Sequence, residues 1–118
     1  MSYVNKPGKT SAWRQMVIRQ QVSDVIAYGQ IQTTFTKAKE TQKHVDRIIT
    51  LGKKNTLDAN RRILAIVKDT KTVKRIDLVH KLHDLAKKYG SRKGGYTRVL
   101  RLGKRPGDNT EVAILELV

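Results

Sequence analysis

The chain has 118 residues, of which 25 are Lys or Arg and 10 are Asp or Glu, giving a formal net charge of +15. It contains no cysteine, which excludes disulfides and thiolate metal sites. The N-terminus has no apolar run of signal-peptide length, and no stretch approaches the roughly 18 apolar residues of a membrane span. We therefore expect a soluble, cytoplasmic protein of ordinary domain size.

The excess of positive charge predicts a polyanionic partner. So much charge on a small body repels itself and destabilises the compact state unless an anion neutralises it. Nucleic acid and an anionic membrane surface are the two natural polyanions. A membrane binder concentrates its basic residues on one amphipathic helix, whereas here they occur in every segment. This distribution favours nucleic acid and argues against a membrane.

The first ten residues are expected to form an extended basic arm. They contain Pro7 and Gly8 and show no apolar periodicity, so neither a helix nor a strand is indicated. Residues 11–118 are expected to fold as a single α+β domain.

From Ala12 the apolar residues recur at helical spacing. Ser11 is expected to cap this helix, and Gly29 is expected to end it. Alternation over residues 30–35 then predicts a short strand. The helical stripe consists of Ile18, Val22, Val25 and Ile26, and the strand places Ile31, Thr33 and Phe35 on one side.

Three further helices are predicted in the middle of the chain. The first is expected to be capped by Thr36 and to end in the segment Gly52–Asn55. The second is expected to begin at Thr56 or Leu57 and to end at a break at 69–71. The third is expected to end at Lys87 and Lys88, before Gly90. Their apolar stripes are Ala38, Val45, Ile48 and Ile49; Ala59, Ile63, Ile66 and Val67; and Ile76, Val79, Leu82 and Ala86.

The last third of the chain changes to strand-like sequence. Residues 96–105 and 110–118 are rich in Val, Leu, Ile and Tyr, and residues 106–109 between them have strong turn chemistry. A C-terminal hairpin is therefore predicted, and the strand at 30–35 is expected to join it. The predicted fold class is α+β, with about four helices packed on a three-stranded mixed or antiparallel sheet.

No catalytic or metal site is indicated. Gly8-Lys9-Thr10 resembles the end of a phosphate-binding P-loop, but that motif needs a glycine at position 3, which is Tyr3. His80, His83 and Asp84 share one predicted helix, but lysines surround them and oppose metal binding. We therefore expect no enzyme activity, no cofactor and no small-molecule substrate.

The basic residues fall into segments that differ in their content of acids. An acid-free basic segment cannot neutralise itself by local ion pairs, so its partner is expected to be an external phosphate. Two long segments are free of acids: the one before Asp24, with Lys6, Lys9, Arg14 and Arg19, and the one between Asp84 and Asp108, with Lys87, Lys88, Arg92, Lys93, Arg98, Arg101, Lys104 and Arg105. Arg61 and Arg62 form a third basic cluster beside Lys53 and Lys54.

Residues 91–98 form the richest of these segments. Gly94 and Gly95 would let the backbone come close to a phosphodiester and donate N–H groups. Tyr96 is either a stacking surface for an unpaired base or a core residue, and Trp13 has the same two interpretations.

The chain resembles the bacterial ribosomal protein L-seventeen family along nearly its full length, because the order and spacing of several short runs match. These runs are Thr10-Ser11-Ala12 with Arg14, Lys37-Ala38-Lys39-Glu40, Ile49-Thr50-Leu51-Gly52-Lys53, Arg61-Arg62, Gly94-Gly95-Tyr96-Thr97-Arg98, Gly107-Asp108 and Glu116-Leu117-Val118.

This resemblance implies an α+β protein of the large ribosomal subunit that contacts ribosomal RNA near the exit of the nascent-chain tunnel, beside neighbouring subunit proteins. It implies no catalytic role. The resemblance and the basic clusters together predict these RNA-binding residues: Lys6, Lys9, Arg14, Arg19, Lys53, Lys54, Arg61, Arg62, Arg92, Lys93, Gly94, Gly95, Tyr96, Arg98, Arg101, Lys104 and Arg105.

Two other classes of protein remain as alternatives. A DNA-compacting architectural protein inserts an apolar or proline wedge from a basic arm, and Pro7 could be one. An RNA-processing nuclease needs a carboxylate or histidine cluster, for which His80 and Asp84 would have to converge with another acid.

Overall fold

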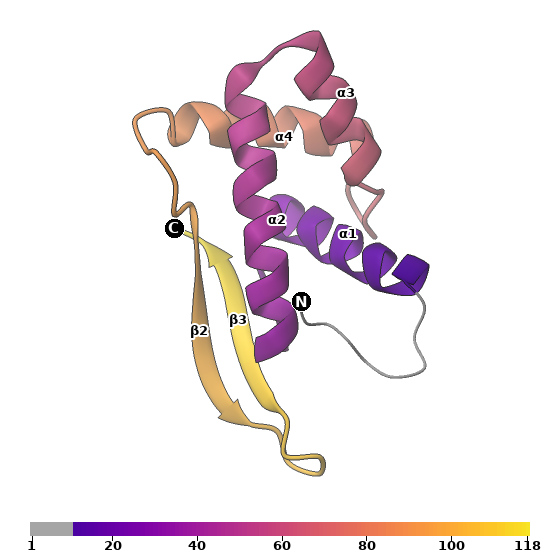
Figure 1. Cartoon of the computed structure of the whole chain (residues 1–118), viewed down its shortest axis with the longest axis vertical. Helices are drawn as coiled ribbons and strands as arrows, with labels where there is room; N and C mark the ends of the chain where they lie inside the picture. The colour runs from indigo at the N-terminus through magenta and orange to yellow at the C-terminus, as the bar shows by residue number, and fades with distance from the viewer. Residues whose placement is uncertain (1–10) are drawn as a thin grey trace.

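The computed structural model describes residues 11–118, so the predicted arm at 1–10 lies outside the described residues. Within that range the chain forms four helices and three strands, which confirms the predicted α+β fold (Figure 1). In chain order they are α1 (Ser11–Tyr28), β1 (Gln30–Thr34), α2 (Phe35–Lys54), α3 (Leu57–Ile66), α4 (Arg75–Lys88), β2 (Thr97–Lys104) and β3 (Glu111–Leu117).

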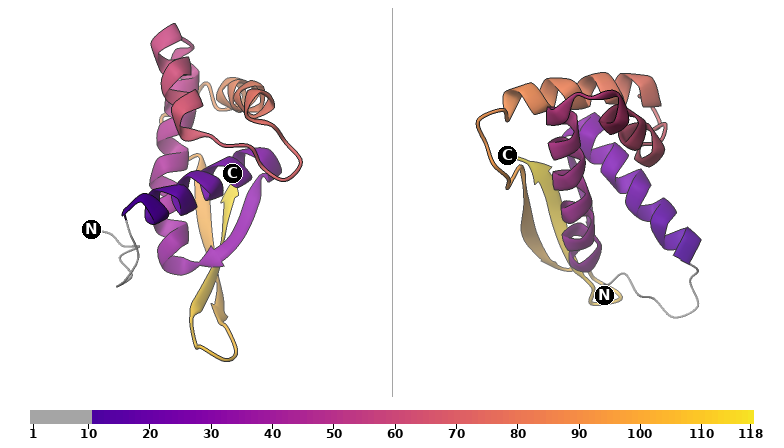
Figure 2. Two further views of the ribbon diagram at one scale, coloured as in Figure 1. Left: turned by 90° about the vertical axis from the view of Figure 1, so that its right-hand side faces the viewer. Right: turned by 45° about the horizontal axis from the view of Figure 1, so that its top comes forward.

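The long helix α2 is the centre of the fold. It contacts the three strands as well as α1, α3 and α4. The β2–β3 hairpin projects away from α3 and α4, toward the opposite end of the molecule (Figures 1 and 2). The position of α2 explains why its buried residues face several elements at once.

Local capping chemistry sets the helix ends. Gly29, at φ 86°, ends α1, and its amide donates to the Val25 carbonyl oxygen at 2.8 Å. Asn55, at φ 49°, ends α2 in the left-handed conformation. The Thr56 hydroxyl accepts from the Ala59 amide at 3.1 Å, which confirms the predicted start of α3.

The start of α2 differs from the prediction. The cap is Thr34, whose hydroxyl accepts from the amide of Lys37 at 3.4 Å, and not Thr36. Because the helix begins directly after this cap, Phe35 is its first residue and not the last residue of the strand.

The buried face of α4 differs from the prediction at one position, while Leu82 and Ala86 are buried as predicted. Ile76 was expected on the buried face but is 67% exposed, whereas Leu78 is fully buried. Leu78, Leu82 and Ala86 are spaced four residues apart and form one row along the helix. This row packs on α2 at Gly52, where a Cβ atom would lie 3.3 Å from Leu82 Cγ and 3.5 Å from Ala86 Cβ.

The sheet is antiparallel throughout, with the order β1-β3-β2. Strand β3 lies in the centre, where Ala113 and Leu115 are completely buried. Strand β2 has an irregularity between Arg101 and Gly103. Leu102, beside this bulge, is exposed.

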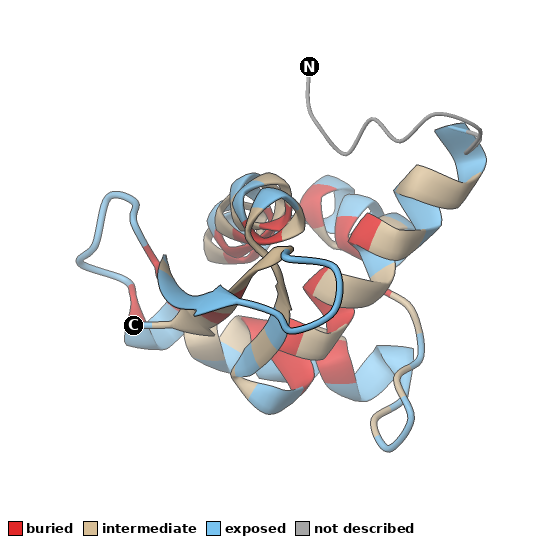
Figure 3. Ribbon diagram, turned by 90° about the horizontal axis from the view of Figure 1, so that it is seen from below, coloured by how far each residue is buried: buried red, intermediate tan, exposed pale blue. Residues whose placement is uncertain are grey.

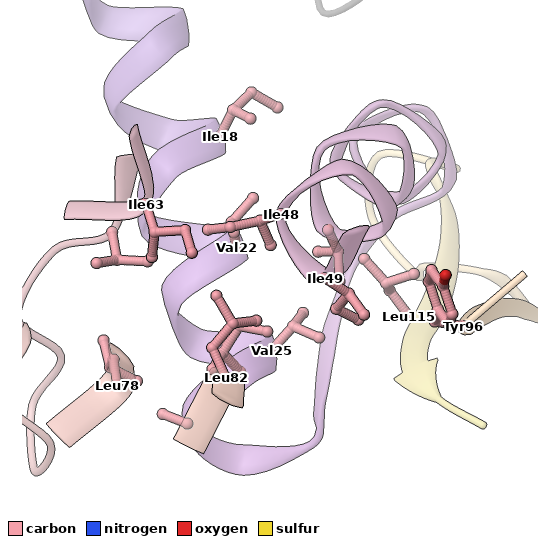
Figure 4. Close-up of a cluster of buried hydrophobic side chains, with 14 of the residues drawn as sticks. Ile18, Val22, Val25, Ile48, Ile49, Ile63, Leu78, Leu82, Tyr96 and Leu115 are labelled. Atoms are coloured by element: carbon pink, nitrogen blue, oxygen red, sulfur yellow. The ribbon is translucent and has the colours of Figure 1, made fainter. Parts of the chain in front are cut away.

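The core joins the helical layer to the sheet through Ile48 and Ile49 of α2 (Figure 4). Ile48 lies near Val22 of α1, and Ile49 lies toward Leu115 of β3. Each side chain of this size contributes about 1.5–3 kcal/mol when it is fully buried. The predicted stripes of α1, α2 and α3 account for most of these residues, namely Ile18, Val22, Val25, Ile26, Ala38, Val45, Ile48, Ile49, Ala59, Ile63 and Val67.

Candidate nucleic-acid interface

The predicted RNA-binding residues lie on separate elements. Lys6 and Lys9 fall outside the described residues. The others are Arg14 and Arg19 on α1, Lys53 and Lys54 at the end of α2, Arg61 and Arg62 on α3, Arg92 to Tyr96 between α4 and β2, Arg98, Arg101 and Lys104 on β2, and Arg105 directly after it.

The segment Tyr89–Tyr96, called the 89–96 loop below, is fixed at both ends by its tyrosines. The two rings pack with centroids 5.4 Å apart. The Tyr89 hydroxyl donates to the Val118 carbonyl oxygen, and the Val118 amide donates to the Tyr96 carbonyl oxygen at 2.9 Å. The loop therefore lies beside the C-terminus (Figure 1).

Tyr96 is a core residue. Its side chain is 2% exposed, and its hydroxyl donates to the Arg92 carbonyl oxygen at 3.2 Å. Of the two interpretations of this residue, the structure therefore supports the core position, and the ring is not available for stacking on a base.

Lys53 also stabilises the 89–96 loop. Its ammonium group donates to the Arg92 carbonyl oxygen and lies 4.5 Å from the centroid of the Tyr96 ring. Two donors therefore fix the Arg92 carbonyl, while the side chains of Arg92 and Lys93 are exposed. Lys53, predicted to contact RNA, holds the loop that carries those two side chains.

Gly94 and Gly95 adjoin open space, since a Cβ atom on either would meet nothing within 4 Å. Only Gly95 has a positive φ, of 63°. The conformation therefore favours glycine at position 95, whereas Gly94 leaves the backbone accessible without being favoured by its own conformation.

Trp13 on α1 is half-buried. The Lys37 ammonium group from α2 lies 5.7 Å from the centroid of its ring. The indole therefore contacts the neighbouring helix and is neither a fully buried core residue nor a free platform.

Three arginines of the hairpin form ion pairs with acidic residues of the same chain. The Nε atom of Arg98 lies 2.6 Å from Oε1 of Glu116, and the Nε atom of Arg101 lies 3.4 Å from Oε1 of Glu111. Arg105 binds Asp108 through two nitrogens. Its hydrogen bond holds the pKa of the Asp108 carboxyl well below the usual range.

The expectation that these three arginines lack an intramolecular partner is therefore wrong. The segment is free of acids in sequence, but β3 and the turn place acids next to it in space. The ion pairs are exposed and leave other N–H donors of Arg98 and Arg101 uncommitted, so phosphate can still reach them.

Arg61 and Arg62 lie on the exposed side of α3. Arg62 pairs with Asp58 at 3.3 Å, as its i, i+4 spacing predicts. Arg62 also lines an open groove between α2 and α3, together with Arg47 and Lys54 of α2.

Sequence reasoning missed a set of basic residues on α2. Lys39, Lys43 and Arg47 are all exposed, and with Lys54 they recur every turn or two of the helix. Intervening Glu40 and Asp46 hid them, because only acid-free runs were sought. A helical period in the exposed Lys and Arg residues is the signal that would have found them.

Of the two intervening acids, Asp46 is directed away from this exposed line, whereas Glu40 lies 4.0 Å from Lys43. Asp46 accepts a hydrogen bond from the Thr97 hydroxyl at 3.0 Å, and burial raises the pKa of its carboxyl. Glu40 lies 3.9 Å from the imidazole of His44, whose own pKa burial lowers.

The histidines on α4 do not form a metal site with their neighbours. Across residues 11–118, no group of three His, Cys, Asp or Glu side chains is arranged to hold a metal ion. His80 and Asp84 are exposed on the helix surface. In the same part of the chain, every helix is too short or too polar to cross a membrane.

Comparison with known proteins agrees with the sequence resemblance. A family model described as "Ribosomal protein L17" matches residues 17–118. The large ribosomal subunit protein bL17 of Malacoplasma penetrans is 66% identical, and the match covers all of both chains. The bL17 protein of Ureaplasma parvum is 62% identical over the full length of both, and that of Mycoplasma pneumoniae is 52% identical over 99% of this chain and 95% of its own. The chain belongs to the ribosomal protein L17 family.

Proposed function

We propose that this chain is a structural constituent of the large ribosomal subunit, in the cytoplasm, where it binds ribosomal RNA and neighbouring subunit proteins without catalysing a reaction. The printed names of its full-length relatives support this role. A net charge of +15 supports RNA as the main partner, because it requires an external polyanion.

The observation that carries the proposal is the construction of the 89–96 loop. Lys53 and Tyr96 fix the Arg92 carbonyl oxygen, and the Arg92 and Lys93 side chains extend into solvent. Arginine can bind phosphate through a bidentate fork, and a prearranged loop loses less conformational entropy when it binds. Such a loop suits the recognition of a fixed RNA shape.

The other predicted residues contribute in different degrees. Lys6 and Lys9 are proposed to add phosphate contacts from the arm, and Arg14, Arg19, Lys54, Arg61 and Arg62 from the helices. The hairpin residues Arg98, Arg101 and Arg105 are proposed to contribute less, since an acid already neutralises each of them. Lys104, the last residue of β2, is exposed and is also proposed to contact phosphate.

The mechanism is neutralisation of charge. Each Lys or Arg that contacts a phosphate displaces a condensed counterion, so the logarithm of the binding constant falls linearly with the logarithm of the salt concentration. Neutralised RNA helices can then approach one another around the protein.

A competition filter-binding assay tests the function. The full chain is bound to a labelled fragment of large-subunit ribosomal RNA, with unlabelled duplex DNA of equal length as competitor. We expect the RNA to be retained against an excess of the DNA. Preference for the duplex DNA would overturn the proposal in favour of an architectural DNA-binding protein.

A further inference from the structure

The outward side of α2 carries one continuous line of polar and basic residues, called the α2 stripe below. The positions are separated by three or four residues, so they lie on one face of the helix. At about 1.5 Å per residue, the stripe is about 22 Å long from Lys39 to Lys54. Its members, all exposed, are Thr36, Lys39, Lys43, Arg47, Thr50 and Lys54.

The remaining faces of α2 are occupied by the fold. Figure 3 looks along α2 from below and shows its buried residues on the side of the protein interior, with exposed residues on the other side. Ile48 and Ile49 lie on that inner side and have no exposed surface. The stripe is therefore the side of α2 that the described fold leaves uncovered.

Helix stability does not explain the charges of the stripe. A helix favours acids at its N-terminus and cations at its C-terminus. The first turn of α2 contains no acid, and Lys39 lies in the N-terminal half, where the macrodipole gives a cation no stabilisation. Only Lys54, in the last turn, lies where the helix itself favours it.

Ion pairing does not explain the charges either. The Lys43 ammonium group lies 4.0 Å from Glu40, but the Lys43 side chain is 75% exposed, so this pair is weak. Asp46 is directed toward Thr97 of the sheet.

Basic residues from other elements widen the stripe at both ends. Arg62 of α3 shares a groove with Arg47 and Lys54. At the other end, the Arg101 guanidinium lies 4.1 Å and the Lys39 ammonium group 5.9 Å from the centroid of the Phe35 ring. Arg62 and Arg101 keep exposed ion pairs with Asp58 and Glu111, so the basic residues of α2 itself supply most of the net positive charge of this surface.

We propose that the α2 stripe binds the phosphate backbone of double-helical RNA, as a surface additional to the 89–96 loop. A straight row of cations matches the regular phosphates along one strand of a duplex, which proteins recognise through the backbone and the shape of the helix. The stripe itself contains no aromatic residue on which an unpaired base could stack. This inference rests on the proposed function and specifies one of its contact surfaces.

The test compares two triple variants of the full chain that remove the same charges. Lys39→Gln, Lys43→Gln and Arg47→Gln neutralise the stripe. Lys71→Gln, Lys74→Gln and Arg75→Gln neutralise an equal set of exposed residues around the start of α4. All six residues are exposed, so both variants are expected to keep a melting temperature close to that of the wild type.

The probe is a blunt RNA duplex of about two turns, titrated by fluorescence anisotropy at several NaCl concentrations. We expect the stripe variant to bind about tenfold or more weakly at low salt, with a log–log salt slope smaller by about 2 to 3. The control variant is expected to stay close to wild type. Equal losses in the two variants would overturn the inference, because net charge alone would then account for them.

Two further measurements separate the possible failures. If wild-type protein binds neither this duplex nor a fragment of large-subunit ribosomal RNA, the proposed function itself fails. If the wild type binds both and the stripe variant behaves like the control, only the α2 stripe is excluded. A stripe variant that loses binding to a poly-glutamate peptide but keeps its affinity for RNA would overturn the inference in favour of an acidic protein partner.

Discussion

Arg98 and Glu116 face each other on adjacent strands of the hairpin, with 2.6 Å between Nε and Oε1. They are 18 positions apart in the chain, so no local window of sequence contains both. Because the pair is largely exposed on the arginine side, it contributes only about 0.2–1 kcal/mol to stability. Its main effect is to lower the positive charge that this strand offers to RNA.

The first prediction compares paired with unpaired arginines. Arg98→Gln combined with Arg101→Gln removes two cations that Glu116 and Glu111 already neutralise. Arg92→Gln combined with Lys93→Gln removes two exposed cations of the 89–96 loop. We expect the loop variant to reduce the log–log salt slope for ribosomal RNA by roughly 0.7–0.9 for each lost contact.

The hairpin variant is expected to reduce the slope by clearly less than the loop variant does. Salt-dependent filter binding of both variants under identical conditions measures the difference. An equal or larger effect in the hairpin variant would show that phosphate displaces Glu111 and Glu116 from their arginines when RNA binds.

The second prediction concerns the adjacent glycines of the loop. Gly95→Ala places a side chain at φ 63° and is expected to cost about 1 kcal/mol of unfolding free energy. Gly94→Ala meets neither a positive φ nor a neighbouring atom, so it is expected to leave stability unchanged while weakening RNA binding. Urea unfolding and filter binding of the two variants separate the effects. Wild-type affinity in Gly94→Ala would exclude a close approach of RNA to this backbone.

The third prediction tests the register of α4. Leu78→Ala is expected to destabilise the protein by about 2–5 kcal/mol, because Leu78 is fully buried. Ile76→Ala, two residues away and exposed, is expected to change stability by no more than about 0.5 kcal/mol. Thermal unfolding of both variants measures the two losses of stability. A larger loss in Ile76→Ala than in Leu78→Ala would show that Ile76 is the buried residue, as expected from sequence.

The fourth prediction concerns pH. Burial raises the pKa of Asp46, so the folded protein binds this proton more tightly than the unfolded chain does. The tighter proton binding contributes to the stability of the folded state. This contribution is fully present below the ordinary pKa of 3.8 and is lost as the pH rises through the raised pKa of the folded state. Asp46→Asn removes the charge but keeps an oxygen that can accept from Thr97.

We therefore expect Asp46→Asn to melt at a higher temperature than wild type at pH 7, and the difference to shrink as the pH falls through the raised pKa of the folded state toward 3.8. The melts are compared in moderate salt, which screens the additional net charge. A constant difference at every pH would show that titration of Asp46 is not its cause.

Most of the fold could be predicted because it depends on local signals. In each of the helices α1 to α3, the apolar residues recur at helical spacing and define a single face. Gly29 and Thr56 are residue types that commonly end and begin helices. In α4, by contrast, Ile76 and Leu78 are both apolar. Which of them is buried depends on how α4 packs against α1, α2 and α3, and a local window of sequence does not contain that packing.

The candidate site could be predicted less completely, because charges act through space. Whether Arg98 is neutralised depends on the pairing register of β2 and β3. Lys53 appeared to be one more surface cation, but its ammonium group is directed to the Arg92 carbonyl, 39 residues away. The α2 stripe could have been found from sequence, provided that basic residues were tested for helical periodicity in the same way as apolar ones.

The position of β3 has a consequence for the order in which the chain folds during its synthesis. β1 and β2 are not paired with each other, and each forms its ladder with β3 alone. β1 consists of residues 30–34, yet its partner consists of residues 111–117, which are made much later. Pairing over so long a separation is slow, and until it occurs both strands expose unpaired backbone groups. A polypeptide arrested before residue 111 can form the helices but has no sheet for α2 to cover, so the fold cannot close until β3 has been made.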